Sequence, residues 1–143
     1  MGMGWIRWRW WRRAETGPEH LRRGRLGGAA ARRHLQGLGL RFLAANFRCP
    51  RGELDLIFRD GDCLVFVEVK TRSREDWTRP AAAVNAGKRK RLSVTALEYL
   101  RRLGHPRVRI RFDVVEVLLQ DGAVREVRHL PAVFPLSAPL WYG

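Results

Sequence analysis

The sequence predicts one α/β domain in which helices flank a mixed central β-sheet. Two observations support this prediction. Segments with helical composition alternate with short runs of β-branched and aromatic residues, in the order helix, strands, long helix, strands. The chain has 143 residues, 45% of them hydrophobic, which is enough for one domain with a real core. The core of the domain contains no internal repeat, and the sequence has no apolar run long enough to cross a bilayer.

Each expected element has a local signature. Gly37 and Gly39 end the first helix, Asp60-Gly61-Asp62 joins two strands in a hairpin, and Pro80 suits the first position of the long helix. The expected elements are a helix over 24–37, strands over 41–48, 53–59 and 63–72, a helix that begins at Pro80, a long or bent strand over 107–119, a weaker strand over 123–127, and an irregular proline-containing tail.

The chain divides at about residue 23 into an extension and a domain. Residues 1–23 interleave Trp with Arg, so this segment could stack on bases and contact phosphates, lie in a membrane interface, or form a mobile extension. We expect the mobile extension, with no essential role and no membrane contact. Residues 24–143 then form the domain, which includes the irregular C-terminal tail.

The charge balance predicts an anionic partner. The chain has 28 Lys and Arg against 14 Asp and Glu, which gives a formal net charge of +14. Such a charge favours nucleic acid ahead of a membrane surface. The two cysteines, Cys49 and Cys63, fit neither a disulfide framework nor a zinc site, so we expect the reducing cytoplasm as the location.

The strand over 63–72 is apolar but carries two opposite charges near its end. Glu68 and Lys70 should point to one face, because side chains alternate along a strand. A charge in a buried strand is costly unless it is paired or bound to a metal. The hairpin places Asp55 on the neighbouring strand, with Glu53 on the same face as Asp55. If Asp55 and Glu68 share a sheet face, two carboxylates and an ammonium group converge.

This combination suits a magnesium ion. Mg²⁺ is usually held by one or two carboxylates together with phosphate oxygens, so Asp55, Glu68 and Glu53 are the candidate ligands, and Mn²⁺ could replace it. Such an ion lowers the pKa of bound water and neutralises a phosphodiester oxygen. Lys70 could orient the attacking water or stabilise charge on the phosphate. The alternative is an Asp/Glu/Lys ion-pair cluster with a purely structural role.

A dense basic turn lies on the long helix. It could be a solvated helix face or a set of phosphate contacts. Together with Arg72 at the end of the central strand, the candidate nucleic-acid contacts are Lys88, Arg89, Lys90 and Arg91.

Asp55 followed by Glu68-Val69-Lys70 resembles the PD-(D/E)xK nuclease superfamily. More closely, a set of motifs in order between Gly24 and Phe134 resembles the YraN family of small bacterial proteins. These motifs are Asn46-Phe47-Arg48, Gly52-Glu53-Leu54-Asp55-Leu56-Ile57, Phe66-Val67-Glu68-Val69-Lys70-Thr71-Arg72, Lys88-Arg89 and Arg111-Phe112-Asp113-Val114-Val115. The resemblance implies a restriction-endonuclease-like fold related to archaeal Holliday-junction resolvases. It also implies that Asp55 and Glu68 are metal ligands and Lys70 is the catalytic lysine.

The sequence departs from the family pattern at Gly28, where family members usually have Glu. In related nucleases an acidic residue on this helix often completes the metal site, and Glu53 could compensate for its absence. We therefore expect a Mg²⁺-dependent endonuclease that hydrolyses DNA, with branched or structured DNA as a candidate substrate. The alternative is a nucleic-acid-binding module that keeps the nuclease fold and does not cut. DNA is expected ahead of RNA, and a homodimer is left open.

Overall fold

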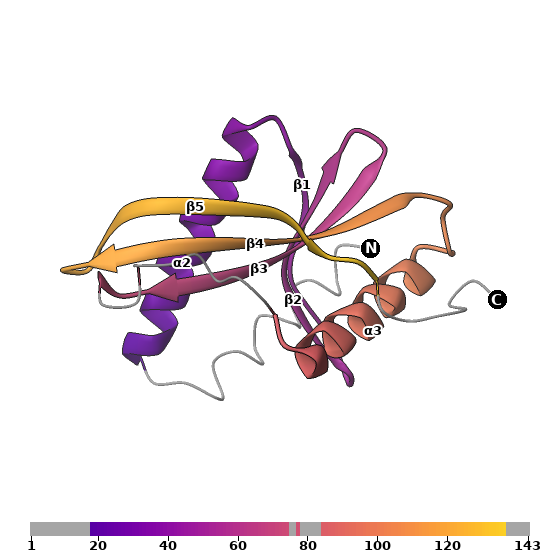
Figure 1. The fold of residues 1–143 in the computed structure, drawn as a ribbon, viewed down its shortest axis with the longest axis horizontal. Coiled ribbons are helices and arrows are strands. Elements are labelled where there is room, and N and C mark those ends of the chain that lie inside the picture. Colours follow the sequence, from indigo (N-terminus) through magenta and orange to yellow (C-terminus); the bar gives the residue numbers. More distant parts are fainter. Residues whose placement is uncertain (1–17, 75–76, 78–83, 137–143) are drawn as a thin grey trace.

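The computed structural model describes residues 18–74, 77 and 84–136 of the chain. Its elements are α2 (Pro18–Gly37), β1 (Arg41–Cys49), β2 (Gly52–Asp60), β3 (Cys63–Arg72), α3 (Ala86–Arg102), β4 (Arg109–Gln120) and β5 (Ala123–Phe134). The strands form one twisted sheet in the order β1-β2-β3-β4-β5 (Figure 1). β3 and β4 are parallel and are connected through α3, while the other neighbours are antiparallel. The predicted mixed sheet is confirmed.

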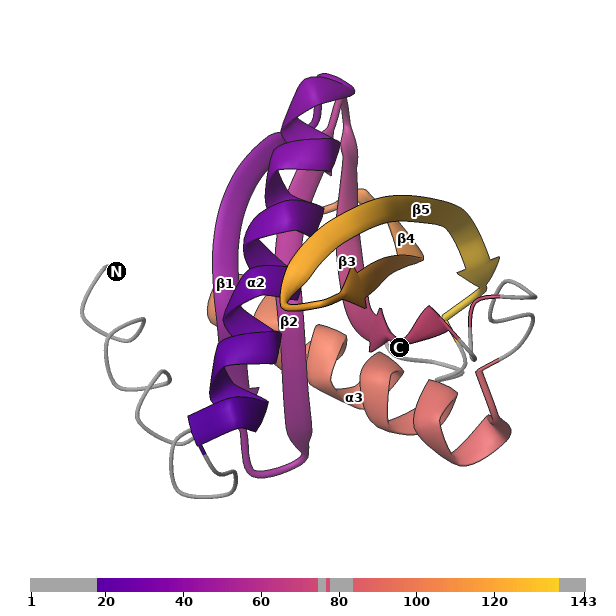
Figure 2. The same ribbon diagram turned by 90° about the vertical axis from the view of Figure 1, so that its left-hand side faces the viewer.

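The two helices cover opposite faces of the sheet and bury two separate hydrophobic clusters (Figures 1 and 2). On one face, Leu35 of α2 packs in a cluster with Phe58 and Val65. On the other face, Leu100 of α3 packs in a cluster with Phe66. Each helix therefore removes one apolar face of the sheet from water, which is the main stabilising contribution in such a layered domain.

The alternation of side chains along β3 decides where its charged end lies. Val65 and Val67 belong to the cluster under α2, whereas Leu64 and Phe66 belong to the cluster under α3. Because the pattern has a period of two, Glu68 continues the α3 side. The same period of two predicts from the sequence that Leu64, Phe66 and Glu68 share a face, which agrees with this arrangement. Helix α3 supplies the wall opposite Glu68.

Helix α3 begins later than the sequence predicts. Pro80 lies outside the described residues, but Val84 and Asn85 are not helical and the helix starts at Ala86. The side chain of Asn85 accepts a hydrogen bond from the Lys88 backbone N–H at 2.9 Å. This is N-cap geometry, which satisfies a free N–H group of the first turn. The prediction of a helix that includes Val84 is wrong because the Asn85 cap sets the start.

Strand β5 is longer than predicted and α2 starts earlier than predicted. β5 continues past Val127 to Phe134, so the expectation of an irregular tail is wrong over this part. Pro131 is tolerated because β5 is an edge strand, and Ala132 next to it has a left-handed backbone with φ 53°. α2 begins at Pro18, so residues 18–23 are helical, while residues 1–17 lie outside the described part of the chain.

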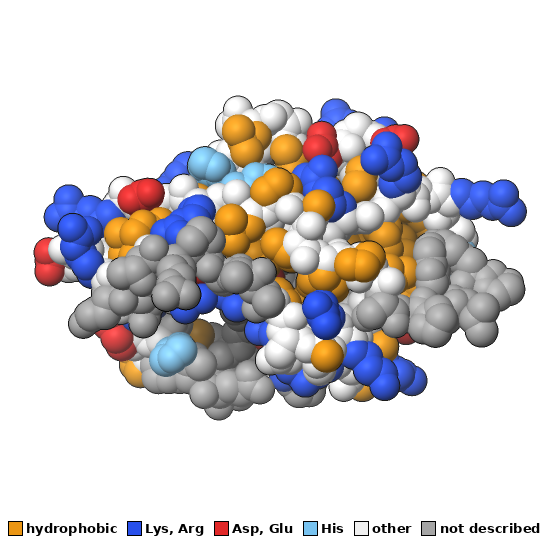
Figure 3. Space-filling view, viewed as in Figure 1, with side chains coloured by type: hydrophobic (Ala, Val, Ile, Leu, Met, Phe, Trp, Pro, Cys, Tyr) orange, Lys and Arg blue, Asp and Glu red, His pale blue; other side chains and the backbone are white. Residues whose placement is uncertain are grey.

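Basic side chains are spread over the face of the molecule in Figure 3 and are not gathered in one stripe. In the described part of the chain, no helix is both long and apolar enough to cross a membrane. The positive charge on the face in Figure 3 is distributed and does not mark one binding site.

Candidate active site

Asp55 lies where the regular alternation of β2 changes. Leu56 and Phe58 pack in the cluster under α2, but Leu54 packs in the cluster on the α3 side. The period of two along residues 53–59 predicts that these three residues share a face, and this prediction is wrong for Leu54. The adjacent strand explains the change, because Asn46 has a left-handed backbone with φ 57° between two regular pairs of the β1–β2 ladder. The irregularity lies next to Asp55.

The carboxylate of Asp55 takes the place of a backbone acceptor in the sheet. The regular β2–β3 pairing ends at Leu56 and Val67. Beyond this pair, Asp55 Oδ2 accepts a hydrogen bond from the Val69 N–H at 2.8 Å. A charge-assisted bond of this kind is shorter and stronger than a neutral one, so it fixes the orientation of the carboxylate. Asp55 is thereby held beside the residue that follows Glu68.

Glu68 forms an ion pair with a residue from the helix opposite. Its Oε2 contacts Lys88 Nζ, and the side chains are 12% and 39% exposed, respectively. Loss of hydration is costly for the Glu68 carboxylate, and the ammonium group offsets that cost. Lys88 lies in the first turn of α3, where a positive charge is unfavourable next to the helix dipole. Each member of the pair therefore reduces an electrostatic cost of the other.

A pocket of about 290 Å³ lies between β2, β3 and α3. The charged residues that line it are Glu53, Asp55, Glu68, Lys88 and Arg91. Gly52, at the start of β2, allows this strand to approach α3 closely, because a Cβ there would lie 2.7 Å from Thr95 Oγ1. The pocket thus brings all three candidate metal ligands together with two of the candidate phosphate contacts.

The remaining sequence-predicted site residues lie outside the lining of this pocket. Lys70 is further along β3 and pairs in register with Glu116 on β4. The Arg72 Nε donates to Glu116 Oε2 at 3.0 Å, so this arginine contacts a buried carboxylate. Arg89 and Lys90 follow Lys88 in α3.

The donor set fits a hard cation that keeps water ligands. Asp55 and Glu68 face the same pocket, and two carboxylates are the usual protein share of a Mg²⁺ site completed by water and phosphate. Among the residues that the structure describes, no three His, Cys, Asp or Glu side chains form a group that could enclose a metal ion. Gly28 adds no donor, and a Cβ at this position would meet nothing within 4 Å. A cation bound in this pocket would therefore have to take most of its ligands from water and phosphate.

A second charged cluster lies on the α2 side of β4, and most of its contacts were not predicted from the sequence. Asp113 accepts two hydrogen bonds from Arg111, at 2.9 and 3.0 Å, and one from the Ala132 N–H at 3.0 Å. His129 Nε2 lies 2.7 Å from Asp113 Oδ2. Burial alone would raise the pKa of the Asp113 carboxyl, but the bonds from His129, Arg111 and Ala132 outweigh it and hold the pKa below its ordinary value. Both carboxylate oxygens are thus engaged by protein groups.

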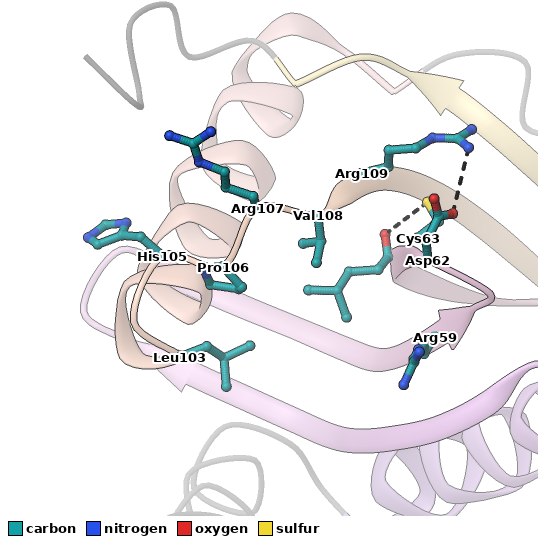
Figure 4. Close-up of a pocket in the computed structure, with 10 residues that line it drawn as sticks. Arg59, Asp62, Cys63, Leu103, His105, Pro106, Arg107, Val108 and Arg109 are labelled. Atoms are coloured by element: carbon teal, nitrogen blue, oxygen red, sulfur yellow. Dashed lines mark hydrogen bonds and ion pairs between the residues drawn. The ribbon is translucent and has the colours of Figure 1, made fainter.

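A larger pocket, of about 900 Å³, lies at the opposite end of β3 (Figure 4). Figure 4 shows Leu103 and Val108 on its apolar wall, with Arg109 paired to Asp62 at 3.6 Å. Burial raises the pKa of the Cys63 thiol in this pocket, which disfavours the reactive thiolate. The pocket lacks a pair of converging carboxylates among its described lining residues, so the smaller pocket is the stronger candidate for an active site.

Comparison with known proteins identifies relatives along most of the chain. The profile of the family described as "Uncharacterised protein family UPF0102" matches residues 27–117. A UPF0102 protein from Geotalea daltonii is 40% identical over 125 residues, which cover 87% of this chain and 98% of the relative. One from Dechloromonas aromatica is 50% identical over 108 residues, or 75% of this chain and 86% of the relative. The chain therefore belongs to the UPF0102 family.

Proposed function

We propose that this protein is a divalent-metal-dependent endonuclease that hydrolyses phosphodiester bonds in DNA. The observation that supports the proposal best is the placement of Asp55 and Glu68 in one pocket whose opposite wall carries Lys88 and Arg91. Carboxylates hold a hard cation and basic side chains bind phosphate oxygens, so this combination of side chains supports the proposal. The resemblance to PD-(D/E)xK nucleases and the net charge of +14 point the same way.

In this proposal each side chain has a separate task. Asp55 and Glu68 hold the cation, and the bond from the Val69 N–H keeps Asp55 oriented for that task. A bound Mg²⁺ or Mn²⁺ supplies Lewis-acid neutralisation of a phosphate oxygen and a more acidic water. Arg91 and the N-terminal turn of α3 attract the phosphodiester to the pocket. Lys70 lies outside the pocket lining, two residues beyond Glu68 on β3, and its proposed task of stabilising negative charge on the phosphate rests on the resemblance to PD-(D/E)xK nucleases.

We propose branched or otherwise structured DNA as the substrate class. This part of the proposal is supported by the resemblance to Holliday-junction resolvases. A junction needs two cuts, which two copies of the chain would supply.

A nucleic-acid-binding module without cleavage activity is the second candidate. It is favoured by the absence of a three-ligand cluster in the described residues and by Gly28 in place of the family's usual Glu. Such a module would bind DNA with a steep salt dependence, and Glu68→Ala would leave its affinity nearly unchanged.

Cleavage of supercoiled plasmid and of a four-way junction tests the first candidate. Wild-type protein should nick or resolve these substrates with Mg²⁺ or Mn²⁺ and should be inactive in EDTA. Asp55→Ala and Glu68→Ala should each reduce the rate by about 10²-fold or more, because loss of a ligand should cost at least as much as the roughly 10- to 100-fold loss seen when an outer-shell partner of a metal site is removed. Asp62→Ala is the matched control, because this exposed carboxylate lies at the other end of β3. Equal rates for wild type and both site variants would reject the assignment, and salt-dependent binding without cleavage would favour the second candidate.

A further inference from the structure

The ion pair between Lys88 and Glu68 occupies the position that a cation would need. Glu68 Oε2 contacts the Lys88 ammonium group, and both side chains line the pocket that also holds Asp55. An ammonium group and a hydrated divalent cation are both positively charged, so either can neutralise the Glu68 carboxylate. They therefore compete for Glu68.

The structure allows Lys88 to leave Glu68 without disturbing α3. The backbone N–H of Lys88 is bonded independently to the Asn85 side chain, so the helix start does not depend on the ammonium group. The Lys88 side chain is 39% exposed and has a flexible four-carbon stem. An ion pair of this exposure is held by a small free energy, which a divalent cation at two carboxylates can exceed.

A phosphate group bound in the same pocket would offer the displaced ammonium group a second partner. Lys88 and Arg91 lie near the N-terminus of α3 and line the same pocket. A phosphate group in the pocket would meet both cations and the positive end of the helix dipole. Because the displaced ammonium group stays at the pocket, a divalent cation on Glu68 raises the charge of the pocket by two, which strengthens the attraction for that phosphate.

We propose that Lys88 is the resident counter-ion of Glu68, that a divalent cation displaces it, and that the released ammonium group then contacts a DNA phosphate at the pocket. The proposal rests on the proposed function, because it takes Glu68 as a metal ligand. It adds a coupling between the two ligands: metal binding improves DNA binding through Lys88, and DNA binding improves metal binding by the same factor.

Direct measurement of Mn²⁺ affinity tests the first step without any need for cleavage. Binding of Mn²⁺ to wild type and to Lys88→Met is followed by electron paramagnetic resonance of the free ion. Loss of the competing ammonium group should tighten Mn²⁺ binding by about 5-fold, the factor of a partly exposed ion pair. Lys90→Met is the control, because it removes the same charge from an exposed position of the same helix.

The salt dependence of DNA binding tests the second step. Anisotropy of a labelled duplex is measured against salt concentration, once in EDTA and once in Ca²⁺ as a cation that does not support cleavage. Lys88→Met should lower the slope of log K against log salt by about 1 in Ca²⁺, where the ammonium group contacts phosphate, and should leave it unchanged in EDTA. Lys90→Met should change the slope by the same amount in both conditions.

The outcomes separate this proposal from the proposed function. Mn²⁺ binding that is lost in Glu68→Gln but equal in wild type and Lys88→Met would overturn the exchange and leave the metal site intact. Equal effects of Lys88→Met on the salt slope in EDTA and in Ca²⁺ would also overturn it. Absence of Mn²⁺ binding in both wild type and Lys88→Met would reject the metal site and the exchange together.

Discussion

Two carboxylates on adjacent parallel strands differ in how they are neutralised. Asp113 on β4 is fully buried on the α2 side and is bonded by Arg111, His129 and the Ala132 N–H. Glu68 on β3 lies on the α3 side, retains some exposure, and is paired with the flexible Lys88. The first carboxylate has several donors in fixed geometry, whereas the second has one partly exposed partner at the wall of a pocket.

We propose that this difference separates a structural charge, at Asp113, from a functional one, at Glu68. Removal of one member of a buried, fully bonded network leaves other charges without partners, which strongly destabilises the fold. A partly exposed ion pair contributes little to stability, because water can replace either partner. We therefore expect changes at Asp113 to affect folding and changes at Glu68 to affect ligand binding.

The largest expected effect is the difference in the free energy of unfolding between Asp113→Asn and Glu68→Gln. Asp113→Asn should lower the free energy of unfolding by about 3 kcal/mol, because Arg111 and His129 lose a charged acceptor. Glu68→Gln should change it by less than about 1 kcal/mol. Urea denaturation monitored by circular dichroism measures both values. Similar losses of stability in the two variants would show that the two carboxylates do not differ in role.

A smaller effect is expected where α2 meets β3 on the Asp113 side. Gly28→Ala should stabilise the helix by about 0.5 to 1 kcal/mol, because its Cβ would meet nothing within 4 Å. At Gly27 a Cβ would lie 2.5 Å from Thr71 Oγ1, so Gly27→Ala should be about 1 to 2 kcal/mol less stable than Gly28→Ala. Thermal and urea denaturation of the two variants give the comparison. Addition of Thr71→Ala should reduce the deficit of Gly27→Ala, and a deficit that persists would place the strain elsewhere.

The smallest effect is expected in the acid dependence of stability. The pKa of the Asp113 carboxyl is lower in the folded protein than in the unfolded chain, because its hydrogen bonds outweigh burial. Its contribution is therefore fully present above the unfolded value of about 4 and is lost as pH falls through the folded pKa. Urea midpoints measured across this range should fall less steeply in Asp113→Asn than in wild type. Glu98, whose pKa is lowered to about 2 by its bond from Arg101, remains in both proteins and contributes equally. Parallel pH profiles would contradict the assignment to Asp113.

The sequence was sufficient for most of the sheet, because its signals there are local. Alternation along β3 and the Asp60-Gly61-Asp62 turn fix the central hairpin, which the structure confirms. The predicted start of α3 was wrong because both Pro and Asn are residues that often begin a helix. The local sequence alone does not decide whether the helix begins at Pro80 or after Asn85. The end of β5 was wrong because proline excludes a central strand but is tolerated at an edge, and edge position depends on the whole topology.

The sequence predicted the two carboxylates of the candidate site, but it did not predict the ion pair that Lys88 forms with one of them. Asp55 and Glu68 lie on strands joined by a short turn, so hairpin geometry predicts that they are neighbours. Lys88 was a candidate phosphate contact, but its pairing with Glu68 depends on the way α3 crosses the sheet. The left-handed backbone of Asn46, which accompanies the change of face at Leu54, likewise has no signal in the period-two pattern.

The central claim is that Asp55 and Glu68 form an exchangeable cation site. The most direct measurement is a crystal structure of the protein with Mn²⁺, with data collected at the manganese absorption edge. The account predicts an anomalous peak between the Asp55 and Glu68 carboxylates, with the Lys88 ammonium group moved away from Glu68. Absence of a peak at these carboxylates, with the Lys88–Glu68 pair unchanged, would contradict it.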